Sequence, residues 1–188
     1  AGTLKAMEQL GDIIIETDTG YRNPVKKIEQ KAYDIILNEQ QRQVSENIKK
    51  TMDFRNDSKP NIHLIHGITG SGKTEVYIDL IDYTISKGKA VIVLIPEIAL
   101  TYQTVMRFTR RFGDRVSIIN SRLSKGERYD QFERAKNGDV DIMIGPRSAL
   151  FTPFKNLGLI IIDEEHESAY KRHWFTFIGC LLYTSPSP

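Results

Sequence analysis

Short apolar runs alternate with longer amphipathic stretches along most of this chain. The runs predict strands at residues 62–65, 90–95, 116–120, 140–144 and 159–162. The stretches between and before them predict helices at residues 37–51, 72–86, 99–112 and 125–136. Strands that alternate with helices form βαβ units, so the pattern predicts an α/β fold with a parallel sheet flanked by helices.

The beginning of the chain follows a different pattern. Residues 2–21 predict a short helix, a β-branched strand and a turn at Asp18-Thr19-Gly20. This order is consistent with the end of a winged-helix-like domain over residues 1–22, and an ordinary α+β edge is the alternative. Asn23-Pro24 breaks the chain, and residues 23–37 are expected to form a charged connector.

The apolar run at residues 62–65 leads into the sequence Gly67-x-x-x-x-Gly72-Lys73-Thr74, which is the pattern of a P-loop. Backbone N–H groups grip phosphates closely only where glycines leave room, and the following helix directs its positive end at the anion. Lys73 supplies a charge for the β- and γ-phosphates, and the Thr74 hydroxyl is a Mg²⁺ ligand. The candidate nucleotide-binding residues are Gly67, Thr69, Gly70, Ser71, Gly72, Lys73 and Thr74.

The last predicted strand runs directly into Asp163-Glu164-Glu165-His166. Ligands of open α/β sheets bind at the carboxyl ends of strands, so this acidic cluster and the P-loop are expected to share one site. We expect Asp163 to hold Mg²⁺ through water and Glu164 to orient or deprotonate the attacking water. His166 either couples the site to another lobe or lies at the surface.

Composition narrows the class of protein. The 188 residues carry a net charge of +2, and 40% are hydrophobic, which suffices for a packed core. One cysteine forms neither a disulfide framework nor a cysteine zinc site, and a reducing, cytoplasmic setting fits. No apolar run reaches the length of a membrane span, and the first residues lack the apolar core of a signal peptide. The start at Ala1 without methionine suggests a fragment or a processed product.

The acidic cluster resembles the DExH box of superfamily 2 helicases. The surrounding stretches resemble one family within it, the bacterial replication-restart helicases, primosomal protein N′ (PriA). Five blocks in the same order carry this resemblance, at residues 66–77, 95–101, 121–128, 145–151 and 162–166. The resemblance covers about residues 4–171 and implies that residues 38–171 form a RecA-like first motor lobe, preceded by the remnant of a winged-helix domain.

The resemblance implies an ATP-dependent 3′-to-5′ DNA helicase that uses ATP and Mg²⁺ in replication restart and primosome assembly. It implies forked or single-stranded DNA as a partner, together with primosome and single-strand-binding proteins, and no membrane. It assigns adenine recognition to Gln41, which is otherwise a surface glutamine on a helix. It also assigns contacts with the DNA backbone to Pro96, Thr101, Arg147 and Ser148. Arg107, Arg110, Arg111 and Arg115 form a basic cluster that either supports DNA binding or is a solvated face.

The family also has a second motor lobe with an arginine finger and a zinc-binding cysteine cluster, and this sequence contains neither. We therefore expect the chain alone to bind Mg-ATP weakly and to hydrolyse it very slowly. Residues 172–188 do not resemble the family, and residues 180–188 resemble translated sequencing-adaptor DNA, so we expect an artefactual tail. Residues 174–183 are apolar without an evident partner, and a genuine docking tail is the alternative.

Two other functions stay open on the sequence. The chain could belong to another P-loop DNA translocase, including the restriction-subunit type, although the blocks at residues 95–101 and 121–128 argue against it. It could also be a non-catalytic ATP- or DNA-binding module, although intact Lys73, Asp163 and Glu164 argue against a loss of catalysis.

Overall fold

The computed structural model describes residues 35–53, 61–68 and 70–164, and the backbone of residues 180–185. The helices are α2 (Glu39–Asp53), α3 (Lys73–Ser86), α4 (Tyr102–Phe112) and α5 (Lys125–Asn137), with short 3₁₀ helices η1 (Gly113–Arg115) and η2 (Arg147–Phe151). The strands are β1 (Asn61–His66), β2 (Ala90–Leu94), β3 (Val116–Ile118), β4 (Ile142–Gly145), β5 (Leu157–Ile162) and β6 (Cys180–Ser185). The expected winged-helix remnant and most of the connector lie outside the described residues.

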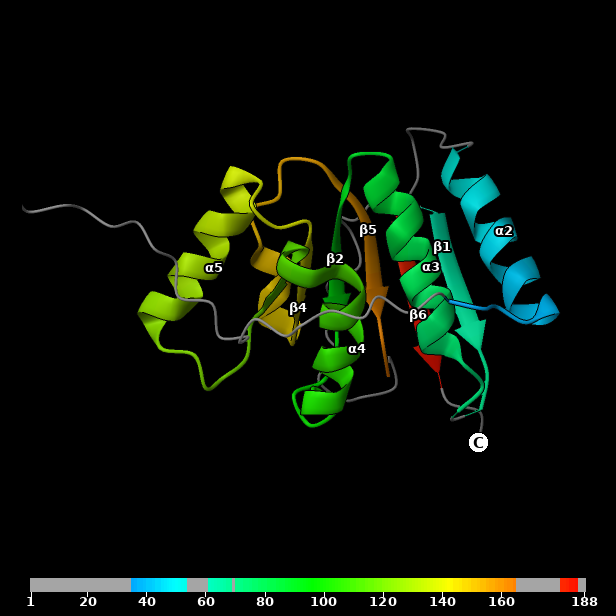
Figure 1. Cartoon of the computed structure of the whole chain (residues 1–188), viewed down its shortest axis with the longest axis horizontal. Helices are drawn as coiled ribbons and strands as arrows, with labels where there is room; N and C mark the ends of the chain where they lie inside the picture. The colour runs from blue at the N-terminus through cyan, green and yellow to red at the C-terminus, as the bar shows by residue number, and fades with distance from the viewer. Residues whose placement is uncertain (1–34, 54–60, 69, 165–179, 186–188) are drawn as a thin grey trace, which may run out of the picture.

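The described strands form one sheet in the order β1-β6-β5-β2-β4-β3, and every pair in it is parallel. The predicted fold class, a parallel sheet flanked by helices, is therefore confirmed (Figure 1). Parallel neighbours require crossover connections, and α3, α4 and α5 lie in the connections between β1, β2, β3 and β4. All carboxyl ends of the strands consequently meet at one edge of the sheet.

Strand β2 shows why the sheet is covered on both faces, since all five of its residues are buried. Val91 and Val93 belong to a core cluster shared with α2, α3 and α4, whereas Ile92 and Leu94 belong to a second cluster shared with α5 and η2. Side chains of a strand alternate between the two faces, so the continuous apolar run follows from burial on both sides.

The helices begin close to where the sequence predicts. Asn38 caps α2: its side-chain Oδ1 accepts from the backbone N–H of Gln41 at 2.9 Å. Helix α5 begins with a capping box, in which Ser124 and Glu127 satisfy each other's backbone N–H groups. Helix α4 begins three residues later than predicted because a turn whose N–H groups bond the Pro96 carbonyl occupies residues 96–100. The predicted loop at residues 145–156 contains η2, which the pattern did not reveal.

Strand β6 is the main difference from the sequence-based expectation. Cys180–Ser185 pairs in parallel with β1 along its whole length and with β5 at three positions. The expectation that this apolar stretch has no evident partner is therefore wrong for the backbone of residues 180–183, and the rest of the stretch lies outside the described residues. That residues 172–188 do not resemble the family, and that residues 180–188 arise from adaptor DNA, stays a prediction.

Candidate active site

The loop between β1 and α3 has the backbone shape that its glycines were expected to permit. Gly70 and Gly72 both adopt φ of +81°, a left-handed conformation that side chains disfavour. The Lys73 ammonium lies against this loop and donates to the carbonyls of Gly67 at 2.6 Å and Ile68 at 3.0 Å. The loop therefore wraps around the amino group that the sequence assigns to phosphate.

The glycines also allow close approaches that a larger residue would prevent. A Cβ atom at Gly67 would lie 2.7 Å from the Ser71 hydroxyl oxygen, and one at Gly72 would lie 2.2 Å from the Gln41 side-chain nitrogen. Gly72 is the N-terminal cap of α3 and bonds no side chain there. The first N–H groups of α3 therefore have no capping side chain to compete with an anion.

Asp163 and Glu164 follow β5 directly. The backbone N–H of Asp163 donates to the Leu94 carbonyl at 2.9 Å, which anchors the end of β5 to β2. The Tyr77 hydroxyl of α3 donates to Asp163 Oδ1 at 3.4 Å, so the acid lies against the P-loop helix, one turn beyond Thr74. Glu164 has φ of +51°, an uncommon value for a side-chain-bearing residue, and its N–H donates to Asp163 Oδ1 at 3.1 Å.

The sheet order sets the distance between the two halves of the site. Strand β1 precedes the P-loop, strand β5 precedes Asp163, and only β6 separates them. Two strand spacings amount to about 10 Å. A triphosphate with its metal ion can bridge such a distance, and the Thr74 hydroxyl and Asp163 carboxylate are the oxygen donors that Mg²⁺ prefers. The donor set and the glycine loop therefore fit Mg-ATP.

Gln41 lies directly at the P-loop. Its side-chain Nε2 donates to the Ser71 carbonyl at 3.0 Å, and its Oε1 accepts from the Asn38 backbone N–H at 2.9 Å. Thirty residues separate Gln41 from Ser71 in the sequence, so only the fold reveals this contact. A position beside the loop is the one an adenine-reading residue requires, and that role stays a prediction.

Two other predicted site residues cannot be placed. Thr69 and His166 lie outside the described residues. The predictions for their roles therefore stay as the sequence left them.

A second group of candidate residues follows β2 and β4, which are neighbours in the sheet. Thr101 is the N-terminal cap of α4 and accepts from the Thr104 N–H at 3.3 Å. Pro96 is buried, and its carbonyl accepts from Ala99 and Leu100, so it shapes the turn rather than presenting a side chain. Arg147 and Ser148 lie in η2 and line a cavity of about 300 Å³ together with Leu150 and Phe151.

Glu97 is a residue of this edge that the sequence analysis missed. Its carboxylate accepts from the Ser121 backbone N–H at 2.7 Å and so joins the loops after β2 and β3. Hydrogen bonds from the Ser121 hydroxyl and N–H lower the pKa of Glu97, and the charges of Arg122 and Arg128 act in the same direction. Glu97 and Ser121 lie in two different blocks that carry the family resemblance, but nothing in the spacing of these blocks indicates that the two residues touch.

The predicted basic cluster is divided in the structure. Arg111 pairs with Asp82 of α3 at 2.6 Å, and Arg115 pairs with Asp141 at 2.6 Å. Arg107 and Arg110 are exposed on α4. The expectation that Arg107, Arg110 and Arg111 form one basic face needs correction, because Arg111 is turned into the contact between α4 and α3.

The described part of the chain contains neither a cluster of metal-binding side chains nor a membrane-spanning helix. Within it, no group of three or more His, Cys, Asp or Glu side chains could hold a metal ion. No helix among the described residues is long and apolar enough to cross a bilayer.

A parallel sheet with a P-loop after one strand and an acidic pair after another defines a RecA-like P-loop NTPase lobe. Residues 34–183 match the family described as "Type III restriction enzyme, res subunit", and the chain belongs to it. Within this class the chain is similar to the replication restart protein PriA, so the resemblance predicted from the sequence is confirmed. PriA of Bacillus subtilis (strain 168) is 44% identical over 173 residues, covering 92% of this chain and 21% of that protein.

Other PriA proteins match at similar levels. The protein of Haemophilus influenzae is 41% identical over 172 residues, covering 90% of this chain and 23% of that protein. The protein of Synechocystis sp. is 52% identical over 113 residues, covering 60% of this chain and 14% of that protein. The chain therefore spans less than a quarter of the length of these relatives. Because these specific matches are to PriA, the alternative of a restriction-subunit-type translocase is not favoured.

Solved structures agree on the fold. The structure of RecG bound to a three-way DNA junction matches with a TM-score of 0.65 at 24% identity, covering 100% of this chain and 23% of that chain. The helicase domain of Pyrococcus furiosus Hef matches with a TM-score of 0.54 at 20% identity, covering 79% of this chain and 32% of that chain.

Proposed function

We propose that this chain is the ATP-binding motor lobe of an ATP-dependent 3′-to-5′ DNA helicase that acts in replication restart and primosome assembly. The observation that carries the proposal is the pairing of a glycine-shaped P-loop with Asp163 across one intervening strand. The similarity to PriA supports the replication-restart setting.

Each residue of the site has a role that follows from its chemistry. Lys73 would exchange its two loop carbonyls for the β- and γ-phosphates, since a phosphate is the stronger partner for an ammonium. Thr74 and Asp163 would hold Mg²⁺, which neutralises phosphate charge. Glu164 would orient the attacking water and accept its proton. Gln41 would hydrogen-bond the adenine, and Thr69 and His166 would complete the site.

The DNA would run along the carboxyl edge of β2, β4 and β3. Arg147 supplies a positive charge there, and Ser148 and Thr101 supply hydroxyl groups, all of which bind phosphate oxygens. Pro96 would contribute by shaping the turn before Thr101. Contacts with the DNA backbone of this kind are independent of base sequence, as a helicase requires, and weaken with added salt.

The remaining partners follow from the similarity to PriA. We propose forked or single-stranded DNA, other primosome proteins and single-strand-binding proteins as partners, in the cytoplasm. We expect zinc in the complete protein.

The test is binding of a fluorescent adenine nucleotide with Mg²⁺ to the chain and to Lys73→Ala. Loss of a charge-assisted contact with phosphate costs about 1.5–3 kcal/mol, so affinity should fall about 10- to 100-fold. Lys136→Ala is the matched control, because Lys136 lies on α5, away from the P-loop, and pairs with its neighbour Glu133 at 3.3 Å. Equal affinity of the wild type and Lys73→Ala would refute the assignment of the P-loop.

A further inference from the structure

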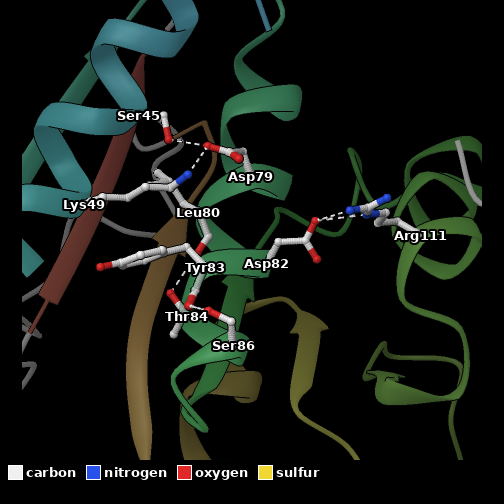
Figure 2. Close-up of polar contacts among 9 residues, drawn as sticks. All are labelled: Ser45, Lys49, Asp79, Leu80, Asp82, Tyr83, Thr84, Ser86 and Arg111. Carbon is white, nitrogen blue, oxygen red and sulfur yellow. Dashed lines mark hydrogen bonds and ion pairs between the residues drawn. The ribbon is translucent and has the colours of Figure 1, made fainter. Parts of the chain in front are cut away.

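Helices α2 and α3 are joined at mid-length by a polar contact that the proposed function does not explain. Asp79 of α3 accepts hydrogen bonds from the Ser45 hydroxyl and, at 2.6 Å, from the Lys49 ammonium of α2 (Figure 2). Ser45 is 1% exposed, and the Lys49 and Asp79 side chains are about a quarter exposed. A contact this sheltered from solvent is screened less than a surface ion pair.

The two helices run side by side in the same direction (Figure 1). Near the beginning of both, Gln41 contacts Ser71 at the P-loop. Near the end of both, Asp53 accepts from the Tyr83 hydroxyl at 2.5 Å. The contact of Asp79 with Ser45 and Lys49 lies between these two, so contacts occur in the same order along both helices.

This order makes the position of α2 along α3 decisive for Gln41. Ser45 lies four residues after Gln41, one helical turn away on the same face. A slide of α2 by a single residue would move Gln41 by about 1.5 Å, whereas hydrogen-bond distances vary by only about 0.5 Å. A contact that prevents such a slide therefore keeps the amide of Gln41 at its height above the P-loop.

The apolar contacts of α2 fix its position along α3, and so the height of Gln41 above the P-loop, less precisely than the hydrogen bonds of Asp79 do. Ile48 of α2 packs into the core, and Met52 of α2 and Leu37, which precedes the helix, are partly buried against it. Apolar burial is non-directional, so it holds α2 on α3 without choosing between nearby positions. The hydrogen bonds of Asp79 are directional, so they favour one position of α2 along α3 over its neighbours.

We propose that Asp79 is a positioning residue for nucleobase specificity. Through Ser45 and Lys49 it holds α2 in the register that presents Gln41 to the adenine, so it favours adenine over guanine nucleotides without touching either. The inference rests on the proposed function, because it requires nucleotide binding at the P-loop and recognition of the base by Gln41.

The experiment measures the affinities of the chain for Mg-ADP and Mg-GDP and takes their ratio. Asp79→Ala should lower the preference for ADP about tenfold, towards the value of Gln41→Ala, and leave GDP affinity nearly unchanged. Asp79→Asn keeps an oxygen acceptor for Ser45 and Lys49 and should restore most of the preference. Adding Gln41→Ala to Asp79→Ala should cause little further loss, since both changes act through one amide.

Asp82→Ala is the matched control. Asp82 lies three residues after Asp79 on α3 and pairs with Arg111 of α4, on the side of α3 away from α2 (Figure 2). Its removal deletes the same charge from the same helix and should leave the ADP-to-GDP ratio unchanged. If Asp79→Ala does not fold, Lys49→Met removes the ionic half of the contact and should lower the ratio to a smaller extent.

The outcomes separate the inference from the proposed function. Loss of ADP preference in Asp79→Ala, with Asp82→Ala unaffected, supports the inference. An equal weakening of both nucleotides, or no change, would show a structural role only and overturn it. A wild type that binds both nucleotides without preference overturns the inference and leaves the P-loop assignment standing. A wild type that binds neither overturns the proposed function itself.

Discussion

Replacement of Gly72 by alanine tests the geometry of the P-loop most directly. Gly72 has φ of +81°, and a Cβ atom there would lie 2.2 Å from Gln41 Nε2. That nitrogen would have to retreat by about 0.8 Å to reach even the 3.0 Å below which Cβ contacts essentially never occur. It is the far end of a flexible side chain, so it will move away and lose its hydrogen bond to Ser71. The change therefore perturbs both the backbone and Gln41.

The cost has two parts. A left-handed conformation costs a residue with a Cβ atom about 1–2 kcal/mol. The lost hydrogen bond adds about 0.5–1.5 kcal/mol. Gly70→Ala is the matched control, because Gly70 has the same φ of +81° but, apart from its chain neighbours, no atom of the described residues lies within 4 Å of a Cβ there. Gly70→Ala should therefore cost only the backbone part.

The assay is urea denaturation of both variants, alone and combined with Gln41→Ala. We expect Gly72→Ala to lower the free energy of unfolding by about 1.5–3.5 kcal/mol and Gly70→Ala by about 1–2 kcal/mol. In the Gln41→Ala background the cost of Gly72→Ala should fall to that of Gly70→Ala, since the obstructing side chain is gone. Equal costs of Gly72→Ala with and without Gln41 would refute the close contact.

Three further predictions concern stability and the loops. Leu94→Ala, at a fully buried position of β2, should lower the free energy of unfolding by about 2–5 kcal/mol, and an unchanged urea midpoint would contradict the packing. Burial lowers the pKa of His63 in the folded protein. As the pH falls, His63 is therefore protonated in the unfolded chain before it is protonated in the folded one, which favours unfolding. Stability should thus be complete above about pH 6.5 and decline below it, and His63→Asn should flatten that decline in a pH series of urea melts. Glu97→Ala should speed hydrogen exchange of the Ser121 amide measured by NMR, whereas Glu97→Gln keeps an acceptor and should change it little; equal rates in all three proteins would argue against the contact.

Local patterns account for what the sequence predicted well. The glycines and Lys73 of the P-loop lie within a few residues of one another, and their backbone requirements belong to that stretch alone. The starts of helices α2 and α5 are equally local, because the capping side chains that the structure shows there, Asn38 and Ser124, each bond a group three residues away. Burial of β2 on both faces showed in its unbroken apolar run. The α/β class, the described strands up to β5 and the helices followed from such signals.

Contacts between distant residues were decided by the tertiary structure alone. The order of the strands, with β6 between β1 and β5, has no signature in any single stretch. The sequence placed Arg111 on a basic face, but the packing of α4 against α3 turns it towards Asp82. Glu97 and Ser121 lie 24 residues apart and meet because β4 separates their strands by a single position.

The sequence by itself therefore determined which chemical groups this protein offers: a phosphate-binding loop, an acidic pair and a glutamine upstream. Those properties reside in residue types and short spacings. The tertiary structure decided how the groups meet, because the register of α2 on α3 and the order of the strands depend on packing across the whole sheet. Gln41 illustrates both contributions: the sequence shows that the glutamine is present, and only the tertiary structure places it beside Ser71.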